Sequence, residues 1–137
     1  MKVSTLGKIK YNIDRESKEV YGKVERFQCG GIIKELAVMM PKRLQKWVGR
    51  DIPVLDICTF GNTFEAKAVA QESDKFDEKV GKSIVAKKLN YKFHDSMARR
   101  YRVIIRELTK ALQIVRTLEA EHRKEADKND EALAKYL

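Results

Sequence analysis

Three arginines in the second half of the chain have the types and spacing that bind an anion. Arg102 and Arg106 are four residues apart, so in a helix both guanidinium groups can reach one phosphate or pyrophosphate. Arg99 extends the same stripe. A solvated basic face is the alternative. The use of arginine favours a binding role, because a guanidinium is a planar fork of donors that also stacks on bases, which a lysine cannot do.

The sequence offers no set of residues with the spacing of a catalytic or metal site. Its two histidines, His94 and His122, fit no Ser–His–Asp arrangement and no metal-ligand pattern. The tripeptide Gly-Lys-Ser at 81–83 resembles the end of a phosphate loop, but Phe76 stands where that loop needs a glycine. We therefore expect a binding protein, with no enzymatic activity, metal or cofactor.

Length and charge limit the classes of protein that fit. The 137 residues suit one domain over 1–137, with a β-rich part at 1–71 and a helical part at 77–137. The net charge of +9 favours nucleic acid, nucleotides or an acidic protein surface as partners. Without a long apolar run or an apolar N-terminal segment, we expect no membrane span and no secretory signal. Two isolated cysteines, Cys29 and Cys58, indicate a cytoplasmic protein.

The three arginines lie in a stretch that predicts a long amphipathic helix. Apolar residues recur in steps of four and three over three heptads, at Met97, Tyr101, Ile104, Leu108, Ala111, Val115 and Leu118. Ile105, Leu112 and Ile114 widen this surface, which favours burial against more than one neighbour. Packing inside one domain and pairing with a second subunit both stay open. If both occur, Arg102 and Arg106 lie near the subunit boundary.

The first half of the chain alternates apolar and polar residues, as strands do. Runs at 2–13 and 18–28, with a polar turn between them, predict an antiparallel hairpin. Runs at 54–60 and 63–71 predict a second hairpin around a Gly-Asn turn. The second hairpin has one face of small residues over which we expect the long helix to lie. The segment 32–40 fits either a helix or a buried strand, Pro41 breaks or restarts the element, and residues 43–48 can form a helical turn.

Capping residues predict where the helices begin. Asp74 or Asp77 suits the start of a short amphipathic helix that ends at Asn90. Asp95 or Ser96 suits the start of the long helix. The sequence thus predicts an α+β fold, in which an N-terminal antiparallel sheet packs on C-terminal helices, the last one long and amphipathic.

Four short stretches resemble a module of small proteins from phages of Gram-positive bacteria. They are residues 60–69, Asp74-Lys75-Phe76-Asp77, Gly81 and Ala86-Lys87-Lys88. That module has a hairpin, an acidic Asp-x-Phe-Asp loop and a helix with a fixed glycine and Ala-Lys-Lys near its end. The resemblance covers about thirty residues of this chain.

In size and order of elements the chain is similar to the phage anti-Thoeris sponge family. Members form dimers and hexamers and sequester cyclic ADP-ribose isomers, and some bind cyclic oligonucleotides. The resemblance implies a homo-oligomer, dimer or hexamer, in the cytoplasm of a bacterial host, with the ligand at a subunit interface. It implies that Arg102 and Arg106 hold the phosphates, that Arg50 is a further candidate, and that Phe76 stacks on a base.

Two functions from different classes follow. The first is a phage counter-defence protein that sequesters a cyclic ADP-ribose isomer or cyclic nucleotide immune signal without cleaving it. The second is a nucleic-acid-binding or anti-CRISPR protein that places the basic helix on a polynucleotide or an immune effector.

Overall fold

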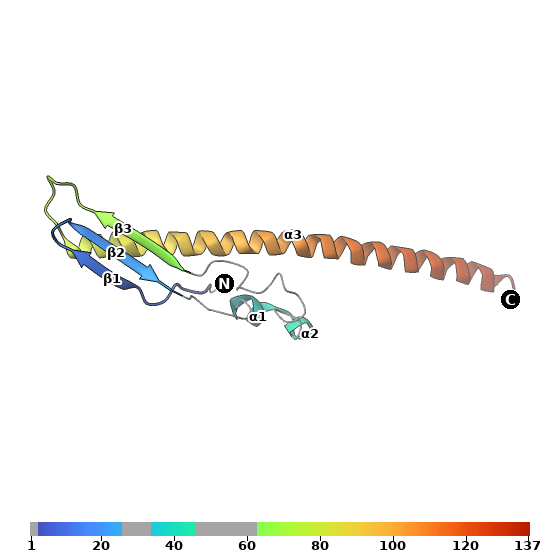
Figure 1. Ribbon diagram of the computed structural model, residues 1–137. Coiled ribbons are helices and arrows are strands. Elements are labelled where there is room, and N and C mark those ends of the chain that lie inside the picture. The colour runs from blue at the N-terminus through green and yellow to red at the C-terminus, as the bar shows by residue number, and fades with distance from the viewer. Residues whose placement is uncertain (1–2, 26–33, 46–62) are drawn as a thin grey trace. The chain divides into compact units, whose positions relative to one another are not determined.

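The computed structural model describes residues 3–25, 34–45 and 63–137. Its elements, in chain order, are β1 (Lys10–Asp14), β2 (Glu19–Val24), α1 (Lys34–Met39), α2 (Lys42–Gln45), β3 (Phe64–Val69) and α3 (Glu78–Ala134) (Figure 1). An N-terminal antiparallel sheet followed by a long C-terminal helix confirms the predicted α+β class. The chain forms two compact units, Met1–Tyr101 and Arg102–Leu137. We call residues 78–101 of α3 its proximal segment and residues 102–134 its distal segment.

The described strands form one antiparallel sheet in the order β1-β2-β3. The hairpin of β1 and β2 confirms the first predicted hairpin, although β1 begins only at Lys10. Its turn is held by Asp14, whose Oδ1 accepts a hydrogen bond of 3.3 Å from the Ser17 amide. That bond lowers the pKa of Asp14. The run predicted at 63–71 forms β3, which pairs with β2, whereas its predicted partner at 54–60 lies outside the described residues.

Side chains on one face of the sheet pack against the proximal segment of α3. On β2, Val20 and Val24 are buried, while Tyr21 and Lys23 are only half-buried, which confirms the predicted alternation. Phe64 of β3 meets Phe93 of α3 edge to face, with ring centroids 5.8 Å apart. Among the described residues of the first unit, the buried apolar side chains are Leu6, Val20, Val24, Phe64, Ala66, Val85, Leu89, Phe93 and Met97. A helix therefore covers the small-residue face, as predicted.

Two glycines let the helix and the sheet approach this closely. A Cβ atom on Gly22 of β2 would lie 2.5 Å from Cγ1 of Val85. A Cβ atom on Gly81 of α3 would lie 2.6 Å from Cγ2 of Val20. Both distances are too short for real carbon contacts, so each position requires a residue without a side chain.

The helix that covers the sheet is not the stretch 97–118 that the heptads predicted for this role. The covering residues are Val85, Leu89, Phe93 and Met97, which recur in steps of four. Steps of four drift around the helix by about 40° each, so the buried stripe winds along α3 instead of following a straight heptad seam. Of the heptad residues, Met97 and Ile104 are buried but Leu108, Val115 and Leu118 are exposed, so most of the packing surface lies earlier in the chain than predicted.

The predicted break between a short and a long helix is also wrong, because α3 is continuous from Glu78 to Ala134. Asn90 does not end a helix: its Nδ2 donates to the Ala86 carbonyl one turn back, at 2.9 Å. Asp95 does not cap one either, but pairs with Arg99. The predicted cap at Asp77 is confirmed, since its Oδ1 accepts hydrogen bonds from the amides of Lys79 and Val80 at 2.9 and 3.3 Å.

The described part of the ambiguous segment 32–40 is helical, and the described part of the helical turn predicted at 43–48 lies in a second short helix. These helices are α1 and α2, which are separated at Pro41. Glu35 of α1 ties together distant parts of the first unit. Its Oε2 accepts a hydrogen bond from the Ser4 amide at 2.9 Å, and its Oε1 accepts one from the Tyr101 hydroxyl at 2.8 Å.

Candidate anion-binding site

The Arg102 and Arg106 side chains lie one turn apart on the distal segment, and both are exposed. Neither forms an ion pair with any residue that the structure describes. Arg99, in the proximal segment, differs, because its Nη2 lies 3.0 Å from Oδ2 of Asp95. The charge of Arg99 is thus partly matched within the chain, whereas the side chains of Arg102 and Arg106 are exposed to solvent.

Arg100, between these residues in sequence, is buried and not part of the exposed stripe. It is 1% exposed, and its Nη1 lies 3.6 Å from Sδ of Met97. Burial lowers the pKa of its guanidinium. A guanidinium nevertheless stays charged in proteins. The sequence contained a signal for this burial, since Arg100 lies three residues after Met97, on the side of the helix where the apolar stripe runs.

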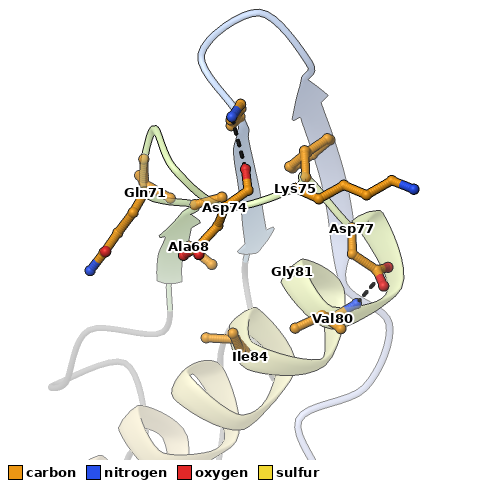
Figure 2. A pocket seen from close by; sticks show the side chains of 12 residues that line it. Ala68, Gln71, Asp74, Lys75, Asp77, Val80, Gly81 and Ile84 are labelled. Carbon is orange, nitrogen blue, oxygen red and sulfur yellow. Dashed lines mark hydrogen bonds between the residues drawn. The ribbon is translucent and has the colours of Figure 1, made fainter.

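Phe76 lies half-buried at a pocket of the first unit, between the end of β3 and the first turns of α3. The pocket has a volume of about 580 Å³, and Figure 2 shows Val80 and Ile84 on its helix side and Asp74 and Lys75 in its loop. The residues that line it are Lys18, Ala68, Val69, Ala70, Gln71, Asp74, Lys75, Phe76, Asp77, Val80, Gly81 and Ile84.

The chemistry of this pocket suits an apolar or aromatic group better than a phosphate. Val80 and Ile84 contribute exposed apolar surface. Lys18 does not offer a free ammonium, since its Nζ donates to the carbonyls of Glu72 and Asp74 at 3.0 and 2.8 Å. The Asp77 carboxylate adds negative charge beside the helix start. The exposed side chains of Val80 and Ile84 therefore offer apolar contacts to a flat base.

One copy of the chain does not bring all the predicted site residues together. Phe76 precedes α3, and Arg99 lies 21 residues after the helix begins at Glu78, which corresponds to about 30 Å along its axis. Arg50 lies outside the described residues. The structure thus brings together Arg102 and Arg106, while Phe76 and Arg99 are too far apart to hold one small ligand within a single chain.

The described residues contain no group of three or more His, Cys, Asp or Glu side chains able to hold a metal ion. Within the same residues, no helix is long and apolar enough to cross a membrane. Comparison with protein families, curated proteins and solved structures gives no match.

Proposed function

We propose that this protein sequesters a small cyclic nucleotide, such as a cyclic ADP-ribose isomer, as a phage counter to an immune signal. The observation that carries the proposal is the pair of exposed arginines, Arg102 and Arg106, one turn apart and without an ion pair among the described residues. Two guanidinium groups at this spacing can each donate paired, charge-assisted hydrogen bonds to a pyrophosphate.

The surroundings of the arginine pair support binding without cleavage. General acid–base catalysis needs a positioned group that can exchange a proton with the substrate. The carboxylate closest in sequence to the pair is Glu107, and its Oε1 lies 3.5 Å from Nζ of Lys110. Around Arg102 and Arg106 the helix therefore offers donors that hold an anion, but no acid and base poised to cleave it.

A second subunit would supply the rest of the binding site. The pocket at Phe76 has the size and apolar lining of a small-molecule site. Because Phe76 and Arg99 are too far apart within one chain to hold one small ligand, a ligand that uses both bridges two copies. Arg50 is a further candidate for such a shared site.

A binding experiment with a matched control tests the role of the arginine pair. We expect Arg102→Ala/Arg106→Ala to weaken binding of a cyclic ADP-ribose isomer at least 100-fold in isothermal titration, because hydrogen bonds to charged groups contribute about 1.5–3 kcal/mol each. The control, Arg123→Ala/Lys124→Ala, removes the same charge from the same helix and should change affinity less than twofold. After denaturation, mass spectrometry should recover the ligand intact. Equal losses in both variants would contradict the proposal.

The second candidate function is binding of a nucleic acid by the basic stripe of α3, in an anti-CRISPR or related role. Arg99, Arg102, Arg106 and Lys110 are exposed at steps of three and four, and the net charge is +9. However, Arg99 and Lys110 are paired with acidic residues at 3.0 and 3.5 Å. Two unpaired arginines suit a small diphosphate better than a long phosphate backbone.

Salt dependence separates these two functions. A protein that contacts several backbone phosphates loses affinity steeply as salt rises, because each contact releases counterions. Binding of an oligonucleotide with a log–log salt slope steeper than about −3, without retention of any cyclic nucleotide, would favour the second function. A shallow slope with retained cyclic nucleotide would favour the first.

A further inference from the structure

The distal segment of α3 exposes more apolar surface than its own unit covers. Five large side chains are between 47% and 62% exposed, namely Ile105, Leu112, Ile114, Val115 and Leu118. Burial of one such side chain contributes about 1.5–3 kcal/mol to the free energy of association, so five of them within four turns strongly favour association. Contiguous apolar surface of this kind marks an interaction site.

This apolar surface is too wide for a single partner helix. Ile105 and Ile114 are nine residues apart, which places them about 180° apart around the helix at 3.6 residues per turn. Leu112, Val115 and Leu118 fall on the arc between them. A two-stranded coil covers only a narrow seam, so half of the circumference requires two neighbouring helices.

The charges of the distal segment indicate how these neighbours run. Residues 102–118 carry four basic side chains and one acidic one, a net charge of +3. Residues 119–134 carry six acidic and three basic side chains, a net charge of −3. A parallel neighbour would set each stretch beside the same stretch of the other copy, which has the same charge. An antiparallel copy sets the basic stretch beside the acidic one. Another copy of this chain thus complements both the surface and the charge.

We propose that residues 102–134 form an antiparallel four-helix bundle with the same residues of three further copies. Each helix contacts two antiparallel neighbours, and a ring of alternating directions closes only with an even number of helices. Four is the smallest such number that gives every helix two different neighbours. An overlap centred near Arg116 brings residues 114–118 of neighbouring helices together and sets residues 102–113, with a net charge of +2, beside residues 119–130, with a net charge of −2.

The bundle leaves the arginine pair accessible. Arg102 and Arg106 lie about 60° and 100° beyond the Ile105 edge of the apolar arc, on the polar side of the helix. The assembly does not depend on nucleotide binding. The apolar contacts that hold it together lie on the other side of the helix. The bundle brings residues 102–134 of neighbouring copies together and not their Phe76, so a ligand that uses both Phe76 and an arginine requires a further contact between copies.

Native mass spectrometry at about 10 µM chain tests the number of copies. We expect about 64 kDa, four times the chain mass of 15.9 kDa, and any other predominant mass would overturn the proposal. Leu112→Glu/Val115→Glu should give monomers, because it places charges inside the arc. Thr109→Glu/Gln113→Glu adds the same charge on the polar side and should leave four copies. Dissociation of both variants alike would also overturn it.

Distances between copies test the direction. A nitroxide label is attached to Asn129→Cys in a chain that also carries Cys29→Ser and Cys58→Ser. Antiparallel neighbours should give interchain label distances beyond about 30 Å, and the diagonal helices should give a second, shorter set of distances. A distribution confined below about 20 Å indicates parallel helices and overturns the proposal.

The unmodified protein offers a second measurement of direction that needs no substitution. Carbodiimide coupling of mixed isotope-labelled chains should join Lys110 of one chain to acidic residues at 119–131 of another. Interchain coupling of Lys110 only to Glu107 would contradict the antiparallel arrangement.

Discussion

The proximal and distal segments of α3 are parts of one helix, but the apolar stripe is buried along the first and, beyond Ile104, exposed along the second. In the proximal segment, Val85, Leu89 and Phe93 are buried under the sheet of the same unit. In the distal segment, Ile105, Ile114 and other large apolar residues remain exposed. The difference arises from the sheet, whose glycine and alanines fit the proximal segment. A periodic apolar face therefore shows that a helix has a partner, but not whether that partner belongs to the same chain.

The largest effect that separates the two segments is expected from Phe93→Ala. Loss of this buried ring should destabilise the first unit by about 3–5 kcal/mol, because a cavity forms against Phe64. Chemical denaturation should show this loss at every protein concentration. Leu112→Ala, the matched change in the distal segment, should instead give a transition that shifts with protein concentration. A concentration-independent loss from both variants would show that the two segments are stabilised in the same way.

A smaller effect is expected where α3 meets β2. Gly81→Ala should destabilise the first unit by about 1–3 kcal/mol, because its new methyl group would overlap Val20, and overpacking outweighs the gain in helix propensity. Ser83→Ala, on the exposed side of the same turn, should stabilise slightly. Thermal unfolding followed by circular dichroism measures both. Stabilisation by Gly81→Ala would show that the helix and the sheet do not pack as closely as described.

The contact between Tyr101 and Glu35 gives the first unit a pH dependence. Burial and the hydrogen bond to Glu35 raise the pKa of Tyr101 above its usual 10.0. A raised pKa means that the contribution is complete below pH 10 and is lost as pH rises through the higher folded value. The melting temperature should therefore fall more steeply above pH 10 in the parent than in Tyr101→Phe, which lacks the titrating group. Identical alkaline profiles would contradict this contact.

The smallest effect is expected at the start of the proximal segment. Asp77→Ala removes the acceptor of two amide hydrogen bonds and should destabilise the first unit by about 1 kcal/mol. Asp74→Ala is the matched control, since the Asp74 backbone carbonyl, not its side chain, binds Lys18. Its effect should stay below about 0.5 kcal/mol. Equal effects in urea denaturation would mean that Asp77 does not act as the cap.

The sequence was sufficient for features that depend on neighbouring residues. The alternation of Val20 and Val24 with half-buried neighbours and the cap at Asp77 follow from local spacing. The continuity of α3 does not, because Asn90 and Asp95 are typical boundary residues that here make bonds within the helix. Burial of Phe93 beside Phe64 keeps this stretch helical, and contacts between distant residues have no local signature.

The candidate site likewise has features that follow from neighbouring residues and features that depend on contacts between distant ones. The exposure and spacing of Arg102 and Arg106 follow from helix periodicity alone. The burial of Arg100 and the distance between Phe76 and Arg99 depend on the packing of the sheet and on the uninterrupted helix. Sequence spacing predicts which residues share a helix face. It did not predict the distance between Phe76 and Arg99, because α3 is one continuous helix where two were expected.

The most direct test of the proposed function is native mass spectrometry of the parent protein after incubation with a cyclic ADP-ribose isomer. The predicted result is an assembly of four chains that carries intact ligand, together with a ligand-free assembly of the same size for Arg102→Ala/Arg106→Ala. Four chains that bind no nucleotide would contradict the proposed function and leave the bundle standing. Nucleotide bound equally by the parent and the double variant would contradict the central role of the arginine pair.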